Sequence, residues 1–278
     1  MKIKTKRIES IDILRGCVMV IMALDHVRDY FHYGSFFNDP TNLETTTPIL
    51  FITRFITHYC APVFVFLAGT SAFLYGSRKT KPELFKFLFS RGIWLIFLEI
   101  VVNNFFWTFD FSFSFQIFQV IWAIGLSMVC LSFLIYLPKK VLLAVGVILI
   151  TGHNMLDGIV TEGQSLKSII WYLLHQEQFL VINPNQIIIL KYPVIPWIGI
   201  MVLGYLFGTF YQRDYAVTKR KKWLLRIGLG ALVIFFVLRG FNIYGDLTPW
   251  SVQDTITKTI LSFFNITKYP PSLLFICI

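Results

Sequence analysis

The chain has 278 residues, of which 56% are hydrophobic and only 14% are charged, and its mean hydropathy is +0.67. A soluble domain of this length is far more polar. Several apolar stretches also approach the roughly 20 residues that cross a bilayer. The composition excludes a soluble globular protein and predicts a polytopic membrane protein that is surrounded by lipid.

The net charge of +10 does not indicate a nucleic-acid partner. The Lys and Arg residues form short clusters between apolar runs, which is how topology signals are distributed in membrane proteins. The four cysteines lie in apolar surroundings, without a CxxC pair or a His partner at metal spacing, so no disulfide framework is expected. These cysteines are Cys17, Cys60, Cys130 and Cys277.

The first predicted element is a long apolar helix over residues 10–33. The basic residues before it place the N-terminus in the cytoplasm; they are Lys2, Lys4, Lys6 and Arg7. Ionisable groups inside a membrane span cost roughly 2.5 to 3.5 kcal/mol each, so they tend to face a bundle interior or a polar cavity. The helix is therefore a candidate site, because it carries Asp12, Arg15, Asp25, His26, Arg28 and Asp29.

Six further spans are predicted in chain order. They cover about residues 55–76, 92–107, 118–137, 141–156, 194–211 and 223–238. Polar segments lie outside at residues 34–53, 157–191 and 239–268. Within the second of these, residues 166–179 have the apolar spacing of an interfacial helix. Basic clusters mark the inner side, so that 17 of the 25 Lys and Arg residues are placed inside.

The fold class expected is all-α, a transmembrane bundle of about seven spans that forms a single domain over residues 1–278. An eighth apolar run begins at Leu273 and is too short at residue 278 to cross the bilayer. We therefore expect the chain to lack its C-terminal spans.

A His and several carboxylates gather near the outer end of the first helix. Asp25 and His26 are neighbours, and Asp29 follows one turn later. A His with a carboxylate beside it suits a general base that takes a proton from a hydroxyl or an amine. A second interpretation stays open, in which Asp25, Arg28 and Asp29 form an ion-pair set and His26 only packs beside it.

Two further histidines are predicted at the same outer depth. His32 ends the first helix, and His58 opens the second, one turn after Arg54. No HxxxH or HxH pair fixes a metal geometry, so a zinc site is not expected. His32 and His58 are second candidates for the base.

Several stretches resemble one known family. RIESIDILRGCVMVIMALDHVRDYF, DPTNLETTTP and THYCAPVFVFLAGTSAFLYG are similar to the catalytic domain of the heparan-alpha-glucosaminide N-acetyltransferase family, in its small bacterial branch. FQVIWAIGLSM and YPVIPWIGIMVLGYLFG add to this resemblance. It implies a multi-pass enzyme of the bacterial plasma membrane, which moves an acetyl group from cytosolic acetyl-CoA to an extracytoplasmic sugar amine or hydroxyl.

The resemblance also bears on the site. Asp25 stands where the animal enzymes carry an Asn, and either His26 or His32 stands at their His. A wider group of transmembrane acyltransferases shares Arg15, Gly16 and a His at the position of His26. The candidate residues are His26, Asp25, His32 and His58 for catalysis, Arg28, Asp29, Asp39 and Arg54 for the substrate, and Arg15 for the donor coenzyme.

A membrane transporter of a solute, or of a glycan or lipid intermediate, is the rival interpretation. Buried ionisable residues also mark translocation paths. An enzyme of this type binds coenzyme A and is stabilised by it against heat, whereas a generic permease is not. A homo-oligomer is compatible with the sequence.

The charge pattern predicts the topology directly. Reporter fusions after Lys81, Lys140 and Lys222 should be cytoplasmic, and fusions at residues 42–47 or at Asp246 should lie outside, because basic loops stay in the cytoplasm. Activity of a compartment-specific reporter measures each position. One inverted fusion among the three inner positions would contradict the topology.

Overall fold

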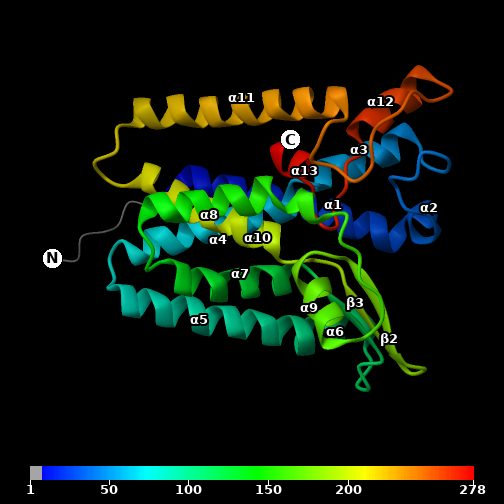
Figure 1. The fold of residues 1–278 in the computed structure, drawn as a ribbon, viewed down its shortest axis with the longest axis horizontal. Helices are drawn as coiled ribbons and strands as arrows, with labels where there is room; N and C mark the ends of the chain where they lie inside the picture. The colour runs from blue at the N-terminus through cyan, green and yellow to red at the C-terminus, as the bar shows by residue number, and fades with distance from the viewer. Residues whose placement is uncertain (1–7) are drawn as a thin grey trace. The chain divides into compact units, whose positions relative to one another are not determined.

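The computed structural model describes residues 8–278 and is mostly helical (Figure 1). The first topology signal lies outside the described residues; it consists of Lys2, Lys4, Lys6 and Arg7. The chain divides into two compact units. The first unit runs to Leu67 and includes Trp250–Asn265, and the second comprises Ala68–Pro249 and Ile266–Ile278.

The first unit is built from helices. They are α1 (Glu9–Phe31), α2 (Tyr33–Phe37), α3 (Pro48–Thr57), the start of α4 (Cys60–Gly76) and α12 (Ile256–Phe264). α3 contacts both α1 and α12, and the Phe55 and Phe264 rings meet edge to face with their centroids 5.5 Å apart. The outer loop expected at residues 34–53 is wrong in part, because α2 and the start of α3 lie there.

The start of α3 has a local cause. The Thr47 hydroxyl accepts a hydrogen bond from the Leu50 backbone N–H at 3.3 Å, and Pro48 occupies the first turn, where its missing N–H costs nothing. The helix ends at Thr57, and α4 begins at Cys60. His58 therefore lies at the C-terminus of α3 and does not open a helix, which corrects the expected start of the second span.

Helices of the second unit pack side by side. They are α5 (Lys81–Phe97), α6 (Asn104–Thr108), α7 (Val120–Leu134), α8 (Lys139–Thr151), α9 (Leu166–Leu174), α10 (Ile195–Phe207), α11 (Val217–Phe241) and α13 (Leu273–Cys277). Short π or 3-10 turns follow α5, α8 and α10 at Leu98–Asn103, His153–Leu156 and Gly208–Tyr211. α5 packs on α7, α7 on α10 and α10 on α8 (Figure 1).

Glycines allow these helices to approach closely. A Cβ atom on Gly69 would lie 2.1 Å from the Met201 carbonyl oxygen of α10. One on Gly92 of α5 would lie 2.6 Å from the Gly125 carbonyl oxygen of α7. Small residues at such crossings let backbones touch where there is no hydrophobic drive between helices in lipid. Gly69 and Gly92 therefore lie at close helix crossings.

A buried carboxylate shapes the turn between α5 and α7. Glu99 is fully buried in the π-helical turn, and it accepts hydrogen bonds from the backbone N–H groups of Gln119 and Trp122 at 3.3 and 3.2 Å. These N–H groups belong to the first turn of α7, where they have no partner within the helix. Glu99 therefore acts as a cap from a neighbouring element.

The described chain is mostly helical, as expected, but it also contains one small sheet that an all-α fold does not include. Its strands are β1 (Phe115–Phe118), β2 (Gln178–Asn183) and β3 (Gln186–Leu190), in the order β1-β3-β2. β3 pairs parallel with β1 and antiparallel with β2. The sequence QFLVINPNQIIIL contains the signal, because two β-branched runs flank a Pro-Asn turn. The interfacial helix expected over residues 166–179 is shorter, because α9 ends at Leu174 and β2 begins at Gln178.

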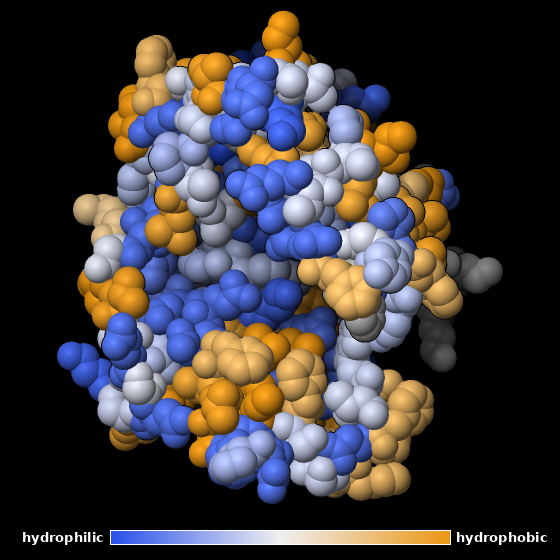
Figure 2. Space-filling model, turned by 90° about the vertical axis from the view of Figure 1, so that its right-hand side faces the viewer, coloured by the Kyte–Doolittle hydropathy of each residue, from blue (hydrophilic) through white to orange (hydrophobic). Residues whose placement is uncertain are grey.

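Two helical stretches among the described residues are long and apolar enough to cross a membrane, Pro48–Gly76 and Val217–Phe241. Val120–Leu134 and Ile195–Tyr211 are apolar but shorter. α7, with 15 residues, covers about 22 Å of a hydrocarbon core that is about 30 Å thick. Figure 2 shows one end of the molecule, where hydrophobic residues reach the surface beside hydrophilic ones. The number of seven spans stays a prediction.

Close packing at Gly69 predicts a large effect of one methyl group. Gly69→Ala should lower the melting temperature in detergent, because the Cβ meets backbone atoms that cannot rotate away, and overpacking costs about 1 to 3 kcal/mol or more. Gly228→Ala in α11 is the matched control, since its Cβ meets nothing within 4 Å. Equal melting of the two variants would contradict the packing described here.

Candidate functional site

Arg28 is the buried centre of the charged cluster on α1. Its side chain is only 4% exposed and donates hydrogen bonds to the carboxylates of Asp25 and Asp29. The distance from Nη2 of Arg28 to Asp29 is 2.8 Å, and Nε is 3.1 Å from the same oxygen. Asp25 lies three residues before Arg28, so the helix brings both to one face. The expected ion-pair set is present.

Asp25 connects α1 to α3. The Thr57 hydroxyl donates to its carboxylate at 2.6 Å, and Nη1 of Arg54 lies 3.6 Å from the same oxygen. Arg54 and Thr57 are three residues apart in the last turns of α3, which places both toward α1. The structure thus brings four predicted residues together, and it adds Thr57, which the sequence interpretation missed. A Thr at the end of an apolar helix gave no sequence signal for this role.

The three candidate histidines differ in their surroundings. His26 is half-buried on α1, while His32 is exposed at the C-terminus of that helix. His58 is buried directly after Thr57, with its ring 6.0 Å from the ring of Phe55. Successive residues on a helix do not face each other, so His26 and Asp25 point in different directions around α1. The roles of all three imidazoles stay predictions.

Arg15 and Asp39 each contact a neighbouring residue of their own segment. Arg15 is ten residues before Asp25, or about 15 Å along the helix, and its guanidinium is 3.7 Å from Asp12. Asp39 accepts hydrogen bonds from the backbone and the hydroxyl of Thr41, both at 2.8 Å, in the loop after α2. Asp39 therefore has a turn-forming role, and its proposed contact with substrate stays a prediction.

One buried donor in the cluster has no partner. Nη1 of Arg28 is buried, and no described residue accepts a hydrogen bond from it. A buried charged donor without an acceptor is costly, and most such groups in folded proteins are satisfied. A substrate oxygen is the kind of acceptor that this guanidinium nitrogen lacks.

The comparison with known families identifies the class of protein. Residues 7–239 match the family model described as "Heparan-alpha-glucosaminide N-acetyltransferase, catalytic". The chain is therefore an acyltransferase. It belongs to the heparan-alpha-glucosaminide N-acetyltransferase catalytic family, as its sequence resemblance predicted. Neither the curated proteins nor the solved structures contain a match.

Burial of Arg28 predicts that the cluster stabilises the first unit. Arg28→Met should reduce the stability of the protein by about 3 to 5 kcal/mol, because two carboxylates lose a buried partner. Arg15→Met is the matched control on the same helix. Its side chain is 40% exposed and its guanidinium lies 3.7 Å from Asp12, so its loss should cost about 1 kcal/mol at most. Melting in detergent compares them, and similar losses would contradict the role of Arg28.

Proposed function

We propose that this protein is a multi-pass acetyltransferase of the bacterial plasma membrane. It transfers an acetyl group from cytosolic acetyl-CoA to an amine or hydroxyl of an extracytoplasmic glycan. The observation that carries this proposal is the family match, whose range, residues 7–239, contains the whole charged cluster of α1 and α3. The same match favours an enzyme over the rival transporter.

In this proposal, His26 is the general base at the outer end of α1. It takes the proton of the acceptor amine or hydroxyl as that group attacks the acetyl carbonyl carbon. The new bond to nitrogen or oxygen forms, the bond from carbon to sulfur breaks, and the coenzyme leaves as its thiolate. The buried ion pairs fix the helix end on which His26 stands.

Arg28 has a second proposed role. Its Nη1 donor, which no described residue satisfies, suits the oxygen on which negative charge develops during acyl transfer. Asp29 and Arg54 complete the polar surroundings of the substrate. At the other end of α1, Arg15 and the inner basic loops attract the phosphates of the donor.

The base assignment predicts a specific loss of activity. His26→Ala should lower acetyl transfer by about 10²-fold or more, because general acid or base groups contribute about 10²- to 10⁴-fold. Transfer from labelled acetyl-CoA to a panel of envelope sugars measures this effect in purified protein. Melting in detergent should stay nearly unchanged, since His26 is only half-buried.

His32→Ala and His58→Ala are the controls. If His26→Ala keeps full activity and His32→Ala loses it, the base is His32 at the end of α1 and not His26. If all three variants keep full activity, the cluster is not the catalytic site. Asp25→Asn should be milder than His26→Ala, because an amide keeps a hydrogen-bonding oxygen for Thr57.

A further inference from the structure

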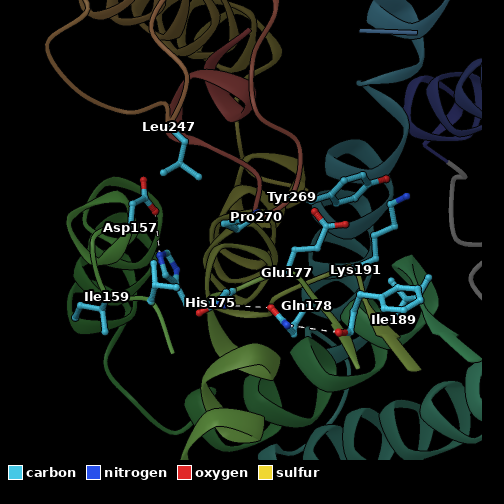
Figure 3. Close-up of a pocket in the computed structure, with 13 residues that line it drawn as sticks. Asp157, Ile159, His175, Glu177, Gln178, Ile189, Lys191, Leu247, Tyr269 and Pro270 are labelled. Carbon is cyan, nitrogen blue, oxygen red and sulfur yellow. Dashed lines mark hydrogen bonds and ion pairs between the residues drawn. The ribbon is translucent and has the colours of Figure 1, made fainter. Parts of the chain in front are cut away.

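A cavity of about 600 Å³ lies within the second unit, among the segments that connect its helices (Figure 3). Its wall includes Asp157 after α8, Lys191 before α10 and Leu247 after α11, each only a few residues from the helix end. α11 is long and apolar enough to cross a membrane, so the residues that follow it are expected at the membrane surface. The cavity is therefore expected at the depth of the lipid headgroups, on the side where the charge pattern places residues 157–191 and 239–268.

One ammonium group lines this cavity. Lys191 is the only lysine or arginine among the described residues of the wall, and its side chain is half-buried. Its Nζ lies 4.9 Å from the centre of the Tyr269 ring, and no described carboxylate forms an ion pair with it. Charges that leave water are usually paired, so this ammonium group is suited to bind an anion.

Two carboxylates line the same cavity, Asp157 and Glu177. One oxygen of Asp157 lies 3.0 Å from Nε2 of His175, and the other accepts a hydrogen bond from the Asn154 amide at 2.8 Å. These contacts hold the carboxylate in place, and each oxygen can accept a further hydrogen bond. Figure 3 shows Asp157 and Lys191 on opposite sides of the cavity. The cavity therefore offers a positive group on one side and a negative group on the other.

Much of the exposed wall is apolar. Ile159, Val160, Phe179 and Leu247 line the cavity, and each is at least half exposed. Apolar side chains that surround a few polar groups are typical of a ligand site, and here they favour a ligand with an apolar part of its own. At headgroup depth, a phospholipid has this combination, because its charged headgroup is joined to acyl chains.

The charges select among phospholipid headgroups. A purely anionic headgroup would meet two carboxylates beside one ammonium group, whereas a zwitterionic headgroup places its phosphate at Lys191 and its cation at the carboxylates. A quaternary cation prefers the face of an aromatic ring, but the Tyr269 ring already has Lys191 and Lys268 at 4.9 and 5.2 Å from its centre. A primary ammonium donates hydrogen bonds, which suits Asp157 and Glu177.

We propose that this cavity binds the headgroup of an outer-leaflet phospholipid that carries a phosphate and a primary ammonium, as phosphatidylethanolamine does. Lys191 binds the phosphate, Asp157 and Glu177 accept hydrogen bonds from the ammonium, and the apolar wall contacts the acyl chains. The bound lipid ties the connections after α8 and α11 to the membrane surface. No residue of the charged cluster on α1 and α3 lines the cavity, so this site shares only the membrane location with the proposed function.

Lipid binding to the purified full chain tests the site. Native mass spectrometry in detergent, with short-chain phosphatidylethanolamine added, gives the dissociation constant. Lys191→Met should weaken binding about tenfold or more, because a charge-assisted hydrogen bond to the phosphate is lost. Lys191→Arg should keep most of the affinity, because the positive charge remains. Lys167→Met is the matched control and should bind like the wild type, since Lys167 lies in the same outer segment, is exposed and does not line the cavity.

Headgroup selectivity is measured in the same way with phosphatidylcholine and phosphatidylglycerol of equal chain length, and with soluble phosphoethanolamine. The ethanolamine lipid should bind about fivefold or more tightly than each, since choline donates no hydrogen bond, glycerol has no positive charge and phosphoethanolamine has no acyl chains. Glu177→Gln should narrow the preference over the choline lipid. Equal losses in Lys191→Met and Lys167→Met would overturn the site. Equal affinity for the ethanolamine and choline lipids, tighter binding of phosphatidylglycerol, or equally tight binding of phosphoethanolamine would also overturn it.

Discussion

Burial of the Arg28 guanidinium is the constraint on which the first unit depends. A charge with a side chain only 4% exposed is tolerated in an apolar helix when carboxylates surround it, and Asp25 and Asp29 fill that role. Asp25 then needs donors of its own, which Thr57 and Arg54 supply from α3. One charge therefore determines how α3 meets α1. The same contacts fix the helix end that carries His26 and the turn that carries His58.

The second unit is held by a different means. Backbone contact at Gly69, Gly92 and Gly125 brings its helices together, and Glu99 caps α7 from a neighbouring turn. These rigid helices carry long polar connections, which fold into the sheet and the cavity around His175. Binding residues are commonly found on loops that a rigid scaffold positions. In this unit, the packed helices therefore provide the scaffold, and the polar connections provide the cavity.

The sequence predicted the helices better than it predicted their ends. Apolar periodicity located α1, α7, α8 and α10 within a few residues, because long apolar runs leave few alternatives. The start of α5 at Lys81 was not predicted, because its charged first turns resemble a loop. The signal was present, since Thr80 and Glu83 form a capping box there. Apolar periodicity also missed the sheet, whose strands pair residues more than 60 positions apart in β1 and β3. Helical spacing predicts that one face of α1 carries Asp25, Arg28 and Asp29. The partners of Thr57 and His175 are distant in sequence, so spacing along the chain does not predict those contacts.

Transfer of the acetyl group between the two sides of the membrane is the central claim of this account. The most direct test uses purified protein in sealed vesicles of known orientation, with labelled acetyl-CoA and glucosamine supplied on chosen sides. We predict labelled product when acetyl-CoA is on the side of the basic loops and the sugar is on the opposite side. Product that forms only when both substrates are on the same side would contradict transfer across the membrane.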